Sequence, residues 1–219
     1  MGSDKIYFRR NLPHFYPKGA TYFITFRLAD SLPQNVINDL KNKYFNENQS
    51  RNKEVNINLE KEAIRNEHFK KFEEQLDKNS YGNCVLKDLS IAEILYNRLL
   101  EFDQNLYALI CFVIMPNHVH LLLTDKIDPP TEINSDEKEV PAGISKAMQM
   151  IKGGSAYLIN KQLKRKGSLW AAESYDRIIR QDAENIINYI LNNPVKANLG
   201  SQFREKPFTY INPEYISIE

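Results

Sequence analysis

Two histidines, His118 and His120, stand one residue apart in the segment IMPNHVHLLL, residues 114–123. The apolar runs on both sides, YALICFVIM and LLLT, are rich in β-branched, aromatic and leucine residues and are typical of strands. Pro116 and Asn117 favour a tight turn, so we expect a hairpin whose second strand begins at His118. Side chains alternate between the faces of a strand, and the two imidazoles therefore share a face. Two imidazoles in this arrangement can chelate one divalent cation.

The same pair could instead belong to the protein core. Burying two imidazoles costs free energy unless each ring finds a hydrogen-bond partner, and this weighs against a purely structural role. The pattern is short and recurs by chance, so both interpretations stay open on these residues alone. Two ligands are fewer than the four of a structural zinc site. A cation held here would keep open positions for another side chain, water or a phosphate oxygen.

A second group of polar side chains lies in the segment AENIINYILNN, residues 183–193. The spacing of its isoleucines predicts a helix, with Asp182 as the N-cap. We expect this helix to end near Asn193, because Pro194 follows and cannot continue the backbone hydrogen bonding.

Tyr189 stands between Asn185 and Asn193 on the polar face of this helix, because the three are four residues apart. A half-exposed tyrosine with a wet hydroxyl is common, and on spacing alone this interpretation is the simpler one. The chemistry changes if the helix lies across the histidine strand. A divalent cation on a phosphodiester would stabilise charge in the transition state and make the phenol a competent nucleophile. Asn193 could then supply a third metal ligand.

The 219-residue chain carries 29 basic and 28 acidic residues, a formal net charge of +1. Global charge therefore does not indicate a polyanionic partner, and only local clusters can. The two cysteines, Cys84 and Cys111, form no CxxC motif, and we identify no signal peptide or membrane-spanning run. We expect a cytoplasmic protein with no membrane partner and no disulfide framework.

The remaining pattern divides the chain into strands and helices. Residues 21–28 alternate as a strand with one buried side, and Ser31-Leu32-Pro33 opens a short helix to about Phe45. A capping-box pattern begins at Ser90, and Gly153-Gly154 marks a kink or the close approach of another backbone in a later helix. We expect further helices at residues 59–77, 90–103 and 144–164, a fourth strand within residues 169–180, and loops at residues 46–58 and 125–143.

This order of elements predicts the α+β class and a ferredoxin-like split β-α-β fold. The core would be a four-stranded antiparallel sheet with two helices on one face, followed by an extra C-terminal helix that carries Tyr189. We expect a single domain over residues 1–219. Its core would span about residues 9–200, with a helical insertion at about residues 33–85 and an irregular tail at residues 201–219.

The histidine pair in MPNHVHLLL, followed by Tyr189 in NYILNNPVKANL, resembles the single-tyrosine HUH transposases, and above all the REP-associated tyrosine transposases. RRNLPHFYPKGATYFITFRL at residues 9–28 and GSLWAAESYDRIIR at residues 167–180 match this family in the same order. The resemblance covers most of the chain from about residue 9 to residue 200, except residues 41–75 and 125–143. The histidine pair together with NPVK just after a tyrosine is specific to this group.

The resemblance implies a role for each matching residue. His118 and His120 would hold Mg²⁺ or Mn²⁺, and Asn193 stands where relatives have a polar metal ligand. Tyr189 would attack a single-stranded DNA phosphodiester and leave a 5′-phosphotyrosine and a free 3′-hydroxyl. The DNA would carry a hairpin beside the cleavage point, and the protein would be bacterial and nucleoid-associated when bound to DNA. Tyr175 is a rival nucleophile, although it lies in an expected strand.

Basic residues could form a track for DNA phosphates, although a solvated charged surface explains any one of them equally well. Trp170 could stack on a base, but a single tryptophan is more often a core residue. The candidate DNA-binding residues are Arg9, Arg10, Lys18, Lys161, Lys164, Arg165, Lys166, Arg177 and Arg180.

Two other functions are compatible with this fold. One is a hairpin-binding protein that does not cut DNA, which the presence of every expected catalytic residue type disfavours. The other is an RNA-binding sheet with exposed aromatic residues, which ranks low because one exposed face would carry the histidines. The active unit could be a monomer or a homodimer.

Overall fold

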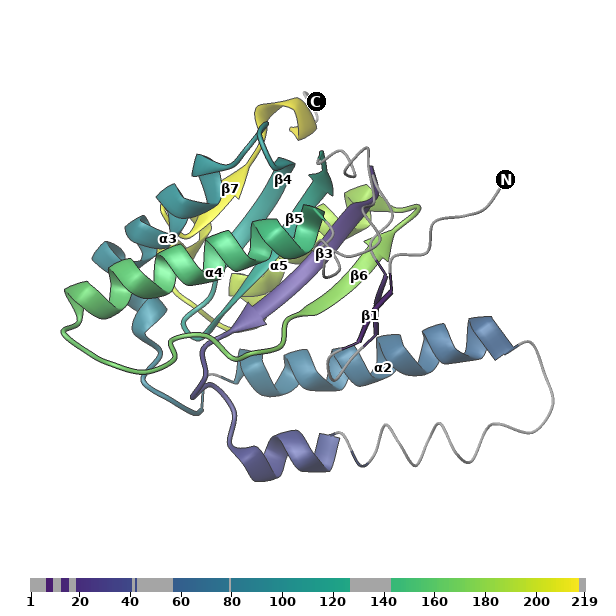
Figure 1. The fold of residues 1–219 in the computed structure, drawn as a ribbon, viewed down its shortest axis with the longest axis horizontal. Coiled ribbons are helices and arrows are strands. Elements are labelled where there is room, and N and C mark those ends of the chain that lie inside the picture. Colours follow the sequence, from purple (N-terminus) through teal and green to yellow (C-terminus); the bar gives the residue numbers. More distant parts are fainter. Residues whose placement is uncertain are drawn as a thin grey trace, which may run out of the picture.

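The strands and helices between residues 21 and 196 follow the predicted order along the chain, and three short strands outside this range were not predicted. The computed structural model describes residues 7–9, 13–15, 19–40, 42, 57–78, 80–126 and 143–216. Its helices and strands are β1 (Tyr7–Arg9), β2 (Pro13–Phe15), β3 (Thr21–Arg27), α2 (Ile57–Asp77), α3 (Leu89–Glu101), β4 (Tyr107–Ile114), β5 (His118–Asp125), α4 (Gly143–Gln162), β6 (Tyr175–Ile179), α5 (Ala183–Lys196) and β7 (Thr209–Ile211) (Figure 1). Residues 34–40 are also helical; the expected helix end near residue 45 and most of the two expected loops lie outside the described residues. None of the helices described here is long and apolar enough to cross a membrane.

Five antiparallel strands form the main sheet, in the order β6-β3-β5-β4-β7, and β1 and β2 form a separate hairpin. Strands β3, β4, β5 and β6 have the ferredoxin-like arrangement that the sequence predicted. β7 pairs with β4, with Cys111 opposite Ile211. The prediction of four strands with an irregular chain after Leu199 was therefore wrong. Three residues are too few to show an alternating pattern, and Pro207 and Pro213 on either side favoured a loop.

Helices cover both faces of the main sheet (Figure 1). α3 and α4 pack on the face that carries Tyr22, Ile24 and Phe26. α5 and side chains of α2 pack on the opposite face, against Phe23 and Leu122. The interior of β3 is therefore buried on both faces, not on one as its alternation suggested. The reason is that α2, in the segment expected to be an insertion, covers the second face.

The starts of two helices differ from the prediction in their caps. The N-cap of α3 is Asp88, whose carboxylate accepts from the backbone N–H groups of Ser90 and Ile91. The capping-box pattern therefore lies inside the first turn, because a stronger acceptor two residues earlier already caps the helix. Asp182 stands at the N-cap of α5 as expected, but its side chain makes no capping hydrogen bond.

α5 continues through Pro194 and ends at Lys196, beyond the predicted end at Asn193. Proline removes one backbone donor, but its own carbonyl still accepts. The backbone N–H of Leu199 bonds to the carbonyl of Pro194, and that of Ala197 bonds to the carbonyl of Asn193. These hydrogen bonds close the last turn of the helix beyond the proline, so Lys196 is still part of α5.

Candidate active site

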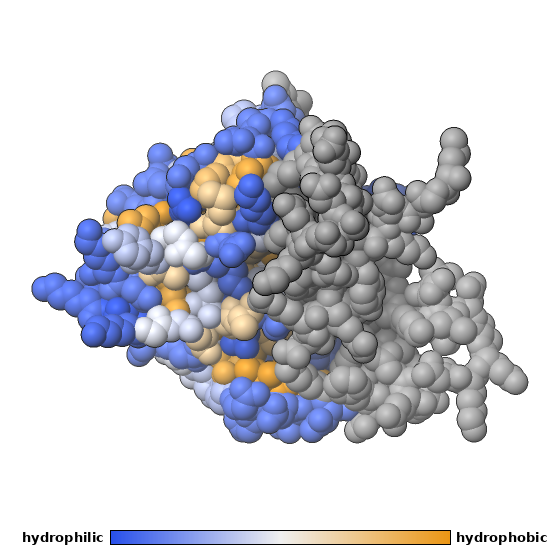
Figure 2. All heavy atoms as spheres, in the orientation of Figure 1, coloured by the Kyte–Doolittle hydropathy of each residue, from blue (hydrophilic) through white to orange (hydrophobic). Residues whose placement is uncertain are grey.

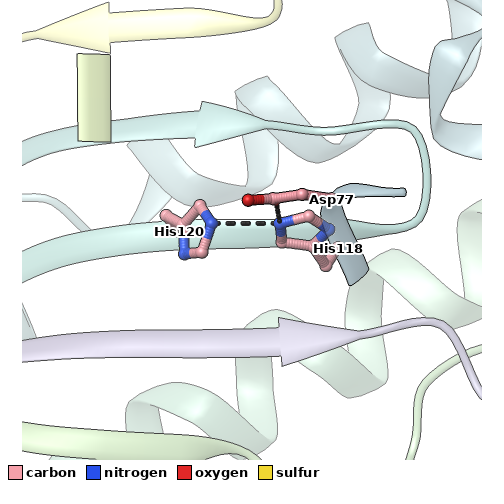
Figure 3. A group of neighbouring side chains, drawn as sticks. All are labelled: Asp77, His118 and His120. Carbon is pink, nitrogen blue, oxygen red and sulfur yellow. Dashed lines mark hydrogen bonds and ion pairs between the residues drawn. The ribbon is translucent and has the colours of Figure 1, made fainter. Parts of the chain in front are cut away.

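His118 and His120 lie on β5 in the middle of the sheet, between β3 and β4. β5 begins at His118 as predicted, and His120 lies opposite Thr25 of β3. Both imidazoles are fully buried, on the face that α2 and α5 cover. Their Nε2 atoms are 3.0 Å apart (Figure 3). The two rings thus share one face, and their inner nitrogens are directed at each other.

The hydrogen bonds of the outer nitrogens determine where each ring carries its proton. Asn117 donates its amide to the carbonyl of Leu76 at 3.2 Å, so its Oδ1 accepts from Nδ1 of His118 at 2.6 Å. Nδ1 of His120 lies 2.8 Å from Oγ1 of Thr25. Burial lowers the pKa of His118 to about 3 and holds the pKa of His120 well below its ordinary value, so both rings are neutral. Rings protonated at Nδ1 present both Nε2 lone pairs as metal ligands.

Asp77, the last residue of α2, adds a carboxylate to the two imidazoles. Its Oδ1 lies 3.5 Å from Nε2 of His118, and the ligand atoms of the three side chains lie within 4.8 Å of one another (Figure 3). Burial raises the pKa of Asp77 to about 6, and the charge of Lys196 opposes that rise. The carboxylate is therefore mostly ionised at neutral pH. Neighbouring ligands ~2.1 Å from an octahedral cation stand ~3.0 Å apart, as the two Nε2 atoms do, so this group fits a divalent cation.

Tyr189 reaches the same face from α5. Its ring is edge-on to Phe23 with centroids 5.9 Å apart, and its centroid is 6.1 Å from that of His120. The hydroxyl donates a hydrogen bond to Oε2 of Glu73. Burial, together with Glu73, raises the pKa of Tyr189 above its ordinary value, so the phenol keeps its proton at neutral pH. The ammonium of Lys196 lies 4.3 Å from the centroid of the tyrosine ring.

Asn193 lies one turn beyond Tyr189 and is fully buried. Its amide makes no hydrogen bond of regular geometry to a residue in the described part of the chain, but it lies close enough to the Tyr189 hydroxyl to oppose the rise of that group's pKa. A buried amide whose donors and acceptor are incompletely paired costs free energy. Binding of a ligand by this side chain would pair them.

Tyr175 and Trp170 both have places in the packed interior. Tyr175 lies in β6 as expected, is 9% exposed, and stacks on Phe69 with ring centroids 3.9 Å apart. Trp170 packs edge-on against Phe26 and donates its indole N–H to Ser155 at 3.0 Å. The interpretation of Trp170 as a core residue is confirmed. The side chain of Tyr175 is less accessible to solvent than that of Tyr189.

The predicted phosphate-binding residues are spread over several regions. Arg177 lies on the histidine face, because it stands opposite Phe23 in the sheet register. Arg180 is exposed just after β6. Arg9 ends β1, whereas Arg10 and Lys18 lie outside the described residues. Figure 2 shows hydrophilic residues gathered over the end of α4, on the other side of the sheet from the histidines. This end of α4 and the turn after it carry Lys161, Lys164, Arg165 and Lys166.

The sequence interpretation missed the two carboxylates that α2 brings to the site, Glu73 and Asp77. Both lie in the segment that was expected to be a charged insertion. A signal was present in the spacing, because Glu73 falls among the apolar positions Phe69, Phe72 and Leu76 of the same helix. An acidic residue within the apolar stripe of a helix faces the packed side and needs a partner there.

Comparisons with known proteins find the same fold in a transposase. No family model and no curated protein matches the chain. The chain is similar to the solved structure of a REP-associated tyrosine transposase bound to a REP hairpin, at 16% identity and a TM-score of 0.50, over 92% of this chain and 82% of that one. It is also similar to a candidate transposase from Deinococcus radiodurans R1, at 18% identity over 81% of this chain and 93% of that one, but the TM-score of 0.31 supports no argument. The first similarity confirms, at the level of the fold, the resemblance seen in the sequence.

Proposed function

We propose that the protein nicks single-stranded DNA beside a hairpin and transfers the cut strand, through a 5′-phosphotyrosine at Tyr189 and with Mg²⁺ or Mn²⁺ held by His118 and His120. The observation that carries this proposal is the meeting, on one face of the sheet, of two Nε2 lone pairs and the tyrosine of α5. The shared fold adds support, because the transposase of that fold is bound to a REP hairpin in its structure.

Tyr189 would act as the nucleophile. Its hydroxyl gives up its proton as the oxygen forms a bond to the phosphorus. The bond from phosphorus to the 3′-oxygen breaks, and the departing oxygen takes up a proton to become a 3′-hydroxyl, so no net proton is gained or lost. A cation bound to the histidines would stabilise the charge that develops on the phosphoryl oxygens. The phosphotyrosine keeps the energy of the phosphodiester. A 3′-hydroxyl can therefore attack it, release the phenol and complete the strand transfer.

Asp77 and Asn193 are the candidates for a third ligand. The amide oxygen of Asn193 is neutral, whereas the carboxylate of Asp77 carries a charge, and hard divalent cations prefer charged oxygen ligands. Asp77 also lies 3.5 Å from Nε2 of His118. We therefore favour Asp77 in the DNA-free protein.

Cations around the site would hold the DNA backbone. Lys196 lies against the ring of Tyr189, and Arg177 lies on the same face of the sheet. Both are suited to contact the phosphate that is cut or its neighbour. The proposed track extends to the other predicted basic residues, Arg9, Arg10, Lys18, Lys161, Lys164, Arg165, Lys166 and Arg180.

Binding of a hairpin without cutting is the second candidate function. One observation favours it: neither His118 nor His120 has any exposed surface. A phosphodiester could contact their Nε2 atoms only after the side chains around them move. A protein in which they never move would bind DNA but form no covalent bond with it.

Covalent trapping separates the two functions. The purified protein would be mixed with a pool of labelled single-stranded hairpins, with Mn²⁺ or with a chelator, and run on a denaturing gel. We expect a Mn²⁺-dependent adduct that resists denaturant, is lost in Tyr189→Phe and persists in Tyr175→Phe, which keeps the stacked ring as a matched control. Tight hairpin binding without an adduct would replace the proposal by the non-cutting function.

A further inference from the structure

Glu73 is a buried acid one turn before the end of α2, and only 4% of its surface is exposed. It belongs to a stretch of the chain that the family resemblance does not cover. Burial raises the pKa of Glu73 to about 8, and the hydroxyls of Tyr189 and Thr25 oppose that rise, because a buried acid ionises only where donors surround it. The polar groups around Glu73 come from three separate parts of the fold: the hydroxyl donors of β3 and α5, and an imidazole of β5.

The two oxygens of Glu73 contact both halves of the candidate active site. Oε1 lies 3.3 Å from Nδ1 of His120 and 3.5 Å from Oγ1 of Thr25. Oε2 accepts the hydrogen bond of the Tyr189 hydroxyl. One rigid carboxylate thus connects the outer nitrogen of a candidate metal ligand to the hydroxyl of the candidate nucleophile.

These contacts fit the tautomer of His120 that can bind a cation. Oγ1 of Thr25 lies 3.5 Å from Oε1 of Glu73 and 2.8 Å from Nδ1 of His120. When the hydroxyl donates to Glu73, Oγ1 accepts from Nδ1 of His120. The proton of His120 is then on Nδ1, and its Nε2 keeps the lone pair that a cation needs.

We propose that Glu73 is a positioning residue that couples the metal ligand His120 to the nucleophile Tyr189, so that α2 is part of the active site and not a peripheral insertion. This inference rests on the proposed function for its catalytic consequence. Through Thr25, Glu73 keeps the proton of His120 on Nδ1, so that Nε2 can bind the cation. By accepting from the Tyr189 hydroxyl, it also keeps the phenol near the histidines. In this role it would act through His120 and Tyr189 and not by contact with the DNA or the cation.

The first test measures Mn²⁺ affinity and adduct formation on the full chain. Glu73→Gln keeps the size of the side chain but replaces one acceptor oxygen by a donor, so either Thr25, which contacts Nδ1 of His120, or Tyr189 loses its acceptor. We expect Mn²⁺ binding, followed by the electron paramagnetic resonance of the free ion, to weaken by about 10–100-fold. Adduct formation should remain slower than in the wild type at saturating Mn²⁺. Glu93→Gln, the same change at an exposed position of α3 on the other side of the sheet, should alter neither quantity.

Two results would overturn the coupling. One is wild-type Mn²⁺ affinity in Glu73→Gln. The other is full recovery of the adduct rate at saturating Mn²⁺, which would mean that Glu73 acts on the metal site alone. Should Glu73→Gln fail to fold, Thr25→Val is the variant to test. It removes the hydroxyl that accepts from His120. Its Mn²⁺ affinity should fall, while its rate of adduct formation at saturating Mn²⁺ should stay near that of the wild type. Unchanged Mn²⁺ affinity in Thr25→Val would also contradict the inference.

A second test does not depend on DNA cleavage. The losses of unfolding free energy in Glu73→Gln and Tyr189→Phe should be non-additive in the double variant, because both remove the same hydrogen bond. Additive losses would contradict the coupling. If the wild-type protein forms no adduct with any hairpin, the proposed function fails, while this cycle and the Mn²⁺ titrations still decide the role of Glu73.

Discussion

At the scale of single residues, the candidate site depends on hydrogen bonds made behind the reacting atoms. Asn117 holds the outer nitrogen of His118, and Thr25 holds that of His120. The rings are neutral because they are buried, so their inner lone pairs are available without loss of a proton. The sequence predicted the shared face of the histidines from strand alternation. It could not predict the partners, since Thr25 is 95 residues away from His120.

Mn²⁺ should stabilise the metal-free protein, because the cation binds the folded chain in preference to the unfolded one. The gain in unfolding free energy should be ~2.7 kcal/mol at a hundredfold excess over Kd, measured by denaturant unfolding with and without the ion. His120→Gln should remove most of the gain. Asp77→Asn should reduce it more than Asn193→Ala does, if Asp77 is the third ligand. A gain that is unchanged in His120→Gln would contradict the metal site.

Cys111 should be unreactive in the native protein. Burial raises the pKa of its thiol to about 12, whereas an unfolded cysteine has a pKa of ~8.5–9. As the pH rises above 9 the unfolded chain loses this proton first, so the contribution of Cys111 to stability is full below pH 9 and declines toward pH 12. Iodoacetamide at pH 8.5 should modify Cys111 only after denaturant is added, as measured by peptide mass. Rapid modification of Cys111 in the native protein would show that β4 is accessible to the reagent, which would contradict its burial.

At the scale of elements, long apolar runs correctly predicted the central strands of the sheet. Short or interrupted sequence patterns did not predict the elements that they form. The hairpin around Pro116 follows from two long apolar runs. β7 is too short to have a pattern, and α5 passes Pro194 because bonds beyond the proline close its last turn. The function of α2 was missed because contact between Glu73 and Tyr189 joins residues 116 positions apart. Such contacts are set by packing and not by local spacing.

The two adjacent glycines of α4 should respond differently to alanine. A Cβ on Gly153 would have no atom within 4 Å, so Gly153→Ala should stabilise the helix by ~0.5–1 kcal/mol. A Cβ on Gly154 would meet the guanidinium of Arg98, which bonds to the carbonyl of Met150 at 2.9 Å and 3.2 Å. Displacing it should offset most of the gain, since a hydrogen bond contributes ~0.5–1.5 kcal/mol. Denaturant unfolding of the two variants compares them directly, and equal stabilisation would argue against the close approach of Arg98.

At the scale of the whole molecule, the site lies between the central sheet and the layer formed by α2 and α5. The net charge of +1 provides no general attraction for DNA, so binding depends on where the basic residues lie. The cluster after α4 is on the other side of the sheet from the histidines. A strand bound at both places would have to pass around the edge or the end of the sheet.

The affinity for a single-stranded hairpin should therefore fall steeply with salt. Removing one lysine that binds a phosphate should reduce the slope of log K against log salt by ~0.7. Changing Lys161, Lys164 and Lys166 together to glutamine should lower the slope, as measured by fluorescence anisotropy at several salt concentrations. Lys126→Gln, at the opposite end of β5 from His118, should leave it unchanged. An unchanged slope in the triple variant would remove the end of α4 from the phosphate track.

The most direct test of the central claim is to locate the covalent bond to DNA within the chain. After trapping with Mn²⁺ and a hairpin, the adduct would be digested with nuclease and trypsin and its peptides analysed by mass spectrometry. Tyr189 is the only tyrosine in the tryptic peptide of residues 181–196, and Tyr175 lies in the peptide of residues 167–177. We predict a nucleotide on the peptide of residues 181–196, absent when a chelator replaces Mn²⁺. A nucleotide on the peptide of residues 167–177, or none on any tyrosine, would contradict Tyr189 as the nucleophile.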